Sequence, residues 1–147
     1  MTRWGSTFAM VDRLLIFKDY CEQVAAAGTK ELKLTQIEWN EALKIRNILE
    51  KPNTTTIVLQ SANITPGLFM KEWKKLCKFL QDNGEEISLG IIASMQKREE
   101  KLFKNTHFLA GVYVDPRYRI LLSPSQTLHA KEGLLDIARR VENKGFH

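Results

Sequence analysis

Residues 65–84, TPGLFMKEWKKLCKFLQDNG, carry a complete helix signal and decide the fold class of the chain. Thr65 can cap the first turn, and Pro66 suits the first helical position, where its missing N–H has no intrahelical partner to lose. Asn83-Gly84 ends the pattern, because glycine readily adopts the left-handed conformation that terminates helices. Between these signals the apolar residues recur at intervals of three and four: Leu68, Phe69, Trp73, Leu76, Cys77 and Leu80. The stretch therefore predicts an amphipathic helix.

The same periodicity covers residues 6–27, which predict a long first helix. Ser6 or Thr7 supplies a side-chain oxygen that can cap its start, and Gly28 follows as a stop signal.

A capping box, Thr35 followed three residues later by Glu38, opens the next predicted helix. Pro52 interrupts it, because proline lacks an N–H and crowds the preceding turn, so we expect a kink or break near Glu50. Residues 54–59 are β-branched and fit a strand by propensity alone. Since no second strand pattern is available to pair with them, we favour a continued or restarted helix.

The C-terminal half predicts at least two more helices. The first covers residues 85–104, whereas residues 106–114 are short, apolar and ambiguous between helix and strand. Residues 115–116, Asp-Pro, indicate a turn or the start of a helix, and residues 123–124, Ser-Pro, open a last helix that Gly145 could terminate. Within residues 85–104 the side chains expected to face inward are Ile87, Ile91, Met95 and Leu102.

Length and composition fit an ordinary globular domain. The chain has 147 residues, of which 44% are hydrophobic and 27% charged, so it can bury a core without disulfides or metal. It has neither an apolar run long enough for a membrane span nor a signal-peptide pattern, so we expect an intracellular protein. The prediction is an all-α fold: one domain, residues 1–147, with about five to seven helices in an antiparallel array.

Catalytic and metal-binding patterns are missing from the sequence. Cys21 and Cys77 stand apart without a CxxC pair, and both lie on apolar helix faces as core thiols would. His107, His129 and His147 have no ligand spacing. Nucleotide-binding and hydrolase motifs are also missing. We therefore expect no enzyme activity, no metal, no cofactor and no small-molecule substrate.

The net charge of +5 and the pI of about 9.3 favour polyanions without identifying one. Glu99 and Glu100, next to basic residues, predict an exposed face of mixed charge. The densest basic cluster can be the solvated side of an amphipathic helix or a strip that contacts DNA phosphates. It consists of Lys71, Lys74, Lys75 and Lys78.

Two motifs resemble those of hAT-family transposases. Residues 2–15, TRWGSTFAMVDRLL, resemble that family's TRWxSTxxMLxRLL stretch, and residues 112–119, VYVDPRYR, resemble its LDPRYK motif further downstream. Between them, residues 34–39, LTQIEW, and the proline after the next helix are similar to the family's LTxxEW and LxP pattern. The resemblance covers most of the chain, and the first motif is the distinctive one.

The resemblance implies a helical insertion. In hAT transposases an RNase H-like fold, which holds divalent metal with two Asp and one Glu, is interrupted by helices that begin just after the Arg-Trp pair. The family's Asp residues precede that pair and its Glu lies downstream, and neither neighbourhood occurs here. Because two-metal catalysis needs converging carboxylates, the resemblance implies a nuclear, DNA-associated piece that does not cut DNA by itself.

The resemblance also gives Trp4 and Arg3 a possible role at DNA. The corresponding tryptophan of the family stacks on a flipped base, which is worth roughly 1–3 kcal/mol. A packing role at the start of a helix is the alternative. Trp39 and Trp73 lie on amphipathic helices and are expected in a core or interface.

Arg117 and Arg119 flank Tyr118 and could contact phosphate. An intramolecular ion pair after the Asp115 turn is the favoured alternative.

Two functions follow as hypotheses. One is a structural and interaction domain that self-associates or binds a protein partner. The other is a DNA-binding fragment that uses Arg3, Trp4 and the lysine cluster.

Overall fold

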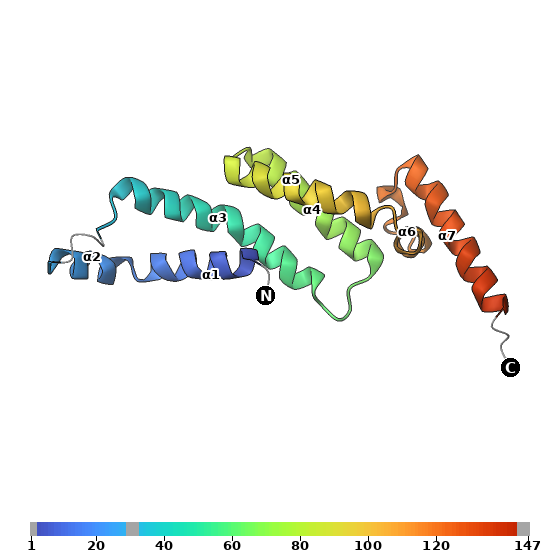
Figure 1. The fold of residues 1–147 in the computed structure, drawn as a ribbon, viewed down its shortest axis with the longest axis horizontal. Helices are drawn as coiled ribbons and strands as arrows, with labels where there is room; N and C mark the ends of the chain where they lie inside the picture. The colour runs from blue at the N-terminus through green and yellow to red at the C-terminus, as the bar shows by residue number, and fades with distance from the viewer. Residues whose placement is uncertain (1–2, 29–32, 144–147) are drawn as a thin grey trace. The chain divides into compact units, whose positions relative to one another are not determined.

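The protein is described by a computed structural model that covers residues 3–28 and 33–143, with the side chains of Arg3 and Trp4 left out. Within these ranges the chain forms seven α-helices and a short 3-10 helix, without a β-strand (Figure 1). The all-α prediction is confirmed. The chain divides into two compact units, Met1–Ile57 and Val58–His147, which are described one at a time. The assignment of the whole chain to one domain stays a prediction.

The first unit begins with two helices where the sequence predicts one. Helix α1 covers Arg3–Ile16 and α2 covers Lys18–Ala26. Phe17 separates them with φ −92° and ψ 16°, yet its N–H still donates to the carbonyl of Arg13 at 3.1 Å. The interruption is therefore local, and the two helices follow one another closely.

The expected cap of the first helix is wrong. Ser6 and Thr7 lie inside α1, which already includes Arg3, because the 3–4 pattern continues upstream of both residues. The expected stop is confirmed, since α2 ends just before Gly28, whose φ is +129°.

Helix α3 covers Gln36–Leu59 and starts at the predicted capping box. Glu38 Oε2 accepts from the Thr35 N–H at 2.7 Å, and Thr35 Oγ1 accepts from the Glu38 N–H at 3.2 Å. These bonds to the charged form hold the pKa of the exposed Glu38 carboxyl below its usual value. The helix passes through Pro52 without a break, so residues 54–59 are helical as favoured and the break expected near Glu50 does not occur.

Helices α1 and α2 lie along α3 within the first unit (Figure 1). Arg46 of α3 ties them together: its Nε donates to Asp12 Oδ1 at 3.0 Å, and its guanidinium lies 5.5 Å from the centre of the Phe8 ring. The bond to Asp12 raises the pKa of Arg46. The buried apolar side chains of this unit are Val11, Ala25, Trp39, Ile48 and Leu49.

The second unit contains α4 (Pro66–Asn83), α5 (Glu86–Leu102), α6 (Thr106–Val114), η2 (Arg119–Leu121) and α7 (Pro124–Asn143). Both signals that frame α4 are confirmed. Thr65 Oγ1 accepts from the Leu68 N–H at 3.2 Å, and Gly84 closes the helix at φ +68°.

The ambiguous segment 106–114 is a helix, and it forms the centre of the second core. Asn105 caps it through a 3.1 Å bond from the Phe108 N–H. Leu109 and Val112 of α6 have no exposed surface and pack with Met70 of α4 and Ala130 of α7. The ambiguity arose because a helix buried on several sides shows no amphipathic period.

Two further predictions from the sequence are confirmed. Residues 115–118 form the predicted turn. Ser123 opens α7, where its Oγ accepts from the Gln126 N–H at 3.2 Å and its own N–H donates to Gln126 Oε1 at 2.9 Å. Gly145 lies outside the described residues.

Helix α5 follows its prediction in part. Ile91 and Met95 are buried and Leu102 is half-buried, whereas Ile87 is exposed. Glu99 is not simply part of an exposed charged face: it is half-buried, and its Oε2 lies 3.4 Å from Trp73 Nε1 as the acceptor of that indole.

Candidate functional site

The lysine cluster of α4 is occupied by contacts inside the second unit. Lys74 Nζ donates to the carbonyl oxygen of Leu121 at 2.7 Å, and Lys71 Nζ lies 5.9 Å from the centre of the Tyr118 ring. Both contacts link α4 to the segment around η2. Two of the four lysines thus have structural partners, which favours the solvated-face interpretation over a free phosphate strip.

The other two lysines pair along their own helix. Lys75 Nζ lies 3.3 Å from Glu72 Oε1, and Lys78 Nζ lies 3.5 Å from Asp82 Oδ2. The side chains of Lys75 and Lys78 are 55% and 78% exposed, whereas Glu72 is only 17% exposed. The Lys78–Asp82 pair, exposed on both sides, contributes little free energy. Phosphate could displace Asp82 from Lys78 at low energetic cost.

The turn after α6 confirms the predicted ion pair. Arg117 holds Asp115 with two bonds, Nε to Oδ1 at 3.0 Å and Nη2 to Oδ2 at 2.7 Å. This pair lowers the pKa of Asp115 and raises that of Arg117. Arg119 is also engaged, because its Nε donates to the Tyr113 carbonyl at 2.9 Å and its guanidinium stacks 4.6 Å from the Tyr113 ring centre.

The structure describes only the backbone of the two residues predicted to contact DNA. Arg3 and Trp4 belong to the first turn of α1, and their side chains lie outside the described part of the chain. Stacking by Trp4 therefore stays a prediction. Trp39 and Trp73 are buried, as expected for core positions.

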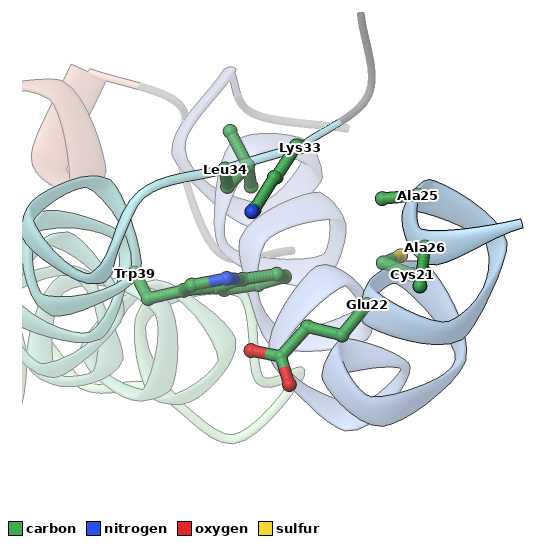
Figure 2. A pocket seen from close by; sticks show the side chains of 7 residues that line it. All are labelled: Cys21, Glu22, Ala25, Ala26, Lys33, Leu34 and Trp39. Carbon is green, nitrogen blue, oxygen red and sulfur yellow. The ribbon is translucent and has the colours of Figure 1, made fainter. Parts of the chain in front are cut away.

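A pocket of about 430 Å³ lies inside the first unit. Sequence reasoning missed it, because it is assembled from α2, residues 33–34 and the start of α3. In Figure 2, Lys33 and Leu34 lie on one side of the Trp39 indole, Glu22 lies on the other, and Cys21 faces its edge. Its lining comprises Cys21, Glu22, Ala25, Ala26, Lys33, Leu34 and Trp39.

One residue of the pocket lining, Trp39, has a buried donor without a partner in the described part of the chain. Trp39 is only 4% exposed, and its Nε1 has no hydrogen-bond partner within the described residues. The ammonium group of Lys18 lies 5.5 Å from the centre of the same ring and 3.8 Å from Glu22 Oε1. A buried N–H without an acceptor costs free energy, so this indole is the polar group of the pocket that a ligand could satisfy.

An apolar stripe runs along the outer face of α1 and α2. Met10, Phe17 and Tyr20 follow a 7 and 3 spacing, with Arg13 between the first two, and Ile16 lies beside them. More than half of each of these four apolar side chains is exposed: Met10 66%, Ile16 71%, Phe17 52% and Tyr20 64%. A cluster of exposed apolar side chains on one face is typical of an interaction surface.

The thiols and carboxylates offer no reactive centre among the described residues. Cys21 and Cys77 are free and half-buried, and burial beside Glu99 raises the pKa of Cys77 to about 11. No group of three or more His, Cys, Asp or Glu side chains is placed to hold a metal ion in this part of the chain. Nor does any described helix combine the length and apolarity that crossing a membrane requires.

Comparison of the chain with protein-family models, with curated proteins and with solved structures finds no match.

Proposed function

We propose that the chain is a non-catalytic helical interaction module, derived from a hAT transposase and acting in a nuclear, DNA-associated protein. The motifs at residues 2–15 and 112–119 support the origin. The observation that carries the interaction role is the apolar stripe of Met10, Ile16, Phe17 and Tyr20.

The stripe suits self-association. Positions 10, 13, 17 and 20 repeat at intervals of three and four, the spacing of a seam between two packed helices. In a two-fold dimer the same stripe of each copy faces the other, so one surface serves both partners. Arg13 lies within this seam and opposes tight pairing, because its charge must stay hydrated at the edge.

Sedimentation velocity tests the proposal. The wild-type chain is expected to sediment as a concentration-dependent dimer, and the triple variant M10S/F17S/Y20S as a monomer. The matched control is L128S/L135S, which removes two comparably exposed leucines from α7 and leaves the dimer intact. Arg13→Leu is expected to strengthen association.

A strict monomer at all concentrations would contradict self-association. A dimer that survives the triple variant but dissociates with the α7 control would move the interface away from α1 and α2.

The transposase origin has its own test in the parent gene. Two Asp codons upstream of the Arg-Trp pair and one Glu codon downstream would make this chain part of an enzyme. A gene without a hAT-like sequence around this segment would contradict the origin while leaving self-association testable.

A DNA-binding fragment is the second candidate. It is favoured by the net charge of +5 and by the exposure of Lys75 and Lys78. Binding to duplex or hairpin DNA is expected at ~50 mM salt and should weaken steeply as salt rises. Lys75→Gln and Lys78→Gln are each expected to reduce the slope of log affinity against log salt by about 1 if that lysine contacts phosphate.

Lys101→Gln, on α5, is the control, with no expected change. Trp4→Ala should weaken binding to a hairpin with an unpaired base more than binding to plain duplex. Equal losses on both would count against stacking, and no retardation at low salt would remove this candidate.

A further inference from the structure

The pocket of the first unit has an apolar wall, and one of its lining residues, Trp39, has a buried indole N–H without a partner among the described residues. Ala25, Ala26, Leu34 and the Trp39 ring supply the apolar surface. A volume of about 430 Å³ falls in the range of small-molecule sites, which are lined mainly by apolar groups with a few polar ones. The size and the lining therefore fit a small amphipathic molecule.

The polar groups of the pocket specify the chemistry of that molecule. Trp39 Nε1 can only donate, and so can the ammonium group of Lys33, so both require an acceptor. Figure 2 shows the Lys33 side chain extending toward the indole, so that one acceptor group could serve both donors. A carboxylate, with two oxygens, has the capacity to do so.

The charges around the indole agree with a single negative charge on the ligand. Among the described residues that line the pocket or lie over the indole, Lys18 and Lys33 are cationic and Glu22 is anionic when ionised, which leaves one positive charge in excess. Lys18 lies near Glu22, at 3.8 Å, so Lys33 is the cation that remains for a ligand. A monocarboxylate balances this excess.

We propose that this pocket binds a small monocarboxylate with an apolar body, whose carboxylate accepts from Trp39 Nε1 and from Lys33. Because Trp39 is almost fully buried, the carboxylate reaches Nε1 only when a side chain at the rim moves. Lys33 is an exposed side chain of that rim. This proposal is independent of self-association, since all lining residues come from one copy.

Nuclear magnetic resonance of the tryptophan indole N–H groups tests the proposal directly. The Trp39 signal is assigned from its disappearance in Trp39→Phe, and three probes with the same six-carbon body are titrated: hexanoate, hexanol and hexylamine. Hexanoate is expected to shift the Trp39 signal and to bind most tightly. A signal that does not move with hexanoate overturns the proposal.

Variants at the rim of the pocket distinguish recognition of the ligand's carboxylate from binding of its apolar body. Lys33→Met should weaken hexanoate about tenfold and leave hexanol unchanged, which is the size expected for one lost charge-assisted hydrogen bond. Glu22→Gln should strengthen hexanoate a few-fold by removing a repulsive charge. Lys51→Met, a lysine of α3 that does not line the pocket, is the control and should change neither ligand.

Three results would contradict the inference. Equal affinity for hexanoate and hexanol would mean that the pocket recognises only the apolar body. Tightest binding of hexylamine would mean that Glu22 selects a cation. A long-lived water molecule detected at the Trp39 N–H in the free protein, and not displaced by hexanoate, would mean that the donor is already satisfied.

Discussion

The two units differ in how fully their cores bury apolar side chains. In the second, Met70, Leu80, Leu109 and Val112 have no exposed surface, and α6 packs against α4, η2 and α7. In the first, α1 and α2 cover α3 with one face and leave Met10, Ile16, Phe17 and Tyr20 more than half exposed. The second unit also exposes apolar side chains, such as Leu128 and Leu135 of α7, so the contrast lies in its fully enclosed core. That core supports assigning structural stability to the second unit, and the stripe on α1 and α2 supports partner contact by the first.

The largest expected effect is a core truncation in the second unit. Leu109→Ala should lower the free energy of unfolding of that unit by about 3 kcal/mol, because the side chain is fully enclosed and leaves a cavity. Val11→Ala, in the less enclosed core of the first unit, should cost about 1.5 kcal/mol. Urea unfolding, followed by hydrogen exchange at residues of each unit, measures both. Equal costs per carbon atom removed, three at Leu109 and two at Val11, would break the contrast between the two cores.

The contact between α6 and α7 provides the next effect. A Cβ at Gly133 would lie 2.4 Å from the backbone oxygen of Thr106, so Gly133→Ala forces two helices apart and should cost about 2 kcal/mol. Gly90→Ala is the matched control, because nothing lies within 4 Å of its Cβ position, and it should be neutral or stabilise α5 by up to about 1 kcal/mol. Thermal unfolding distinguishes the pair. A harmless Gly133→Ala would show that the two helices do not approach so closely.

Helix caps should behave alike in both units, since their bonds are local. Thr65→Ala removes the cap of α4 and Thr35→Ala removes the cap of α3, and each should cost about 1 kcal/mol. Hydrogen exchange in the first turn of each helix reports the loss. A much larger effect at Thr35 would indicate that α3 depends on its cap more than on packing, which would sharpen the contrast between the units.

The smallest effect concerns pH. Hydrogen bonds from Arg140 and, to a lesser degree, from His107 at 3.1 Å hold the pKa of Asp136 below its usual value. A lowered folded-state pKa stabilises the fold above the ordinary pKa of Asp, and this contribution disappears as pH falls through the lowered value. Asp136→Asn should therefore be slightly less stable than wild type at pH 7, with the difference vanishing in acid. A difference that grows on acidification would contradict this linkage.

Most helix starts and ends could be predicted from local motifs in the sequence. Thr65, Gly84 and the Thr35 capping box predicted their helix ends because each acts on amides within one turn. Ser6 failed as a cap because the apolar pattern extends upstream of it. Pro52 failed as a break, since a helix can continue through one missing N–H.

Contacts between residues that lie far apart in the sequence could not be predicted from it. The partners of Glu99 and Lys74 lie 26 and 47 positions away in the sequence, so no local pattern could indicate them. The same holds for the pocket around Trp39, which needs two helices and the chain between them. Sequence periodicity identified the apolar faces of α1 and α2, but which side stays uncovered depends on the number of helices that pack there.

The raised pKa of Cys77, about 11, has a practical consequence for chemical labelling. At pH 7 about one thiol in ten thousand would be present as the reactive thiolate, so maleimides and oxidants should leave this cysteine untouched in the folded chain. The other cysteine, Cys21, lies in the pocket wall. A fluorescent probe could therefore be attached beside Trp39 in the wild-type sequence, and hexanoate should protect that position from attachment.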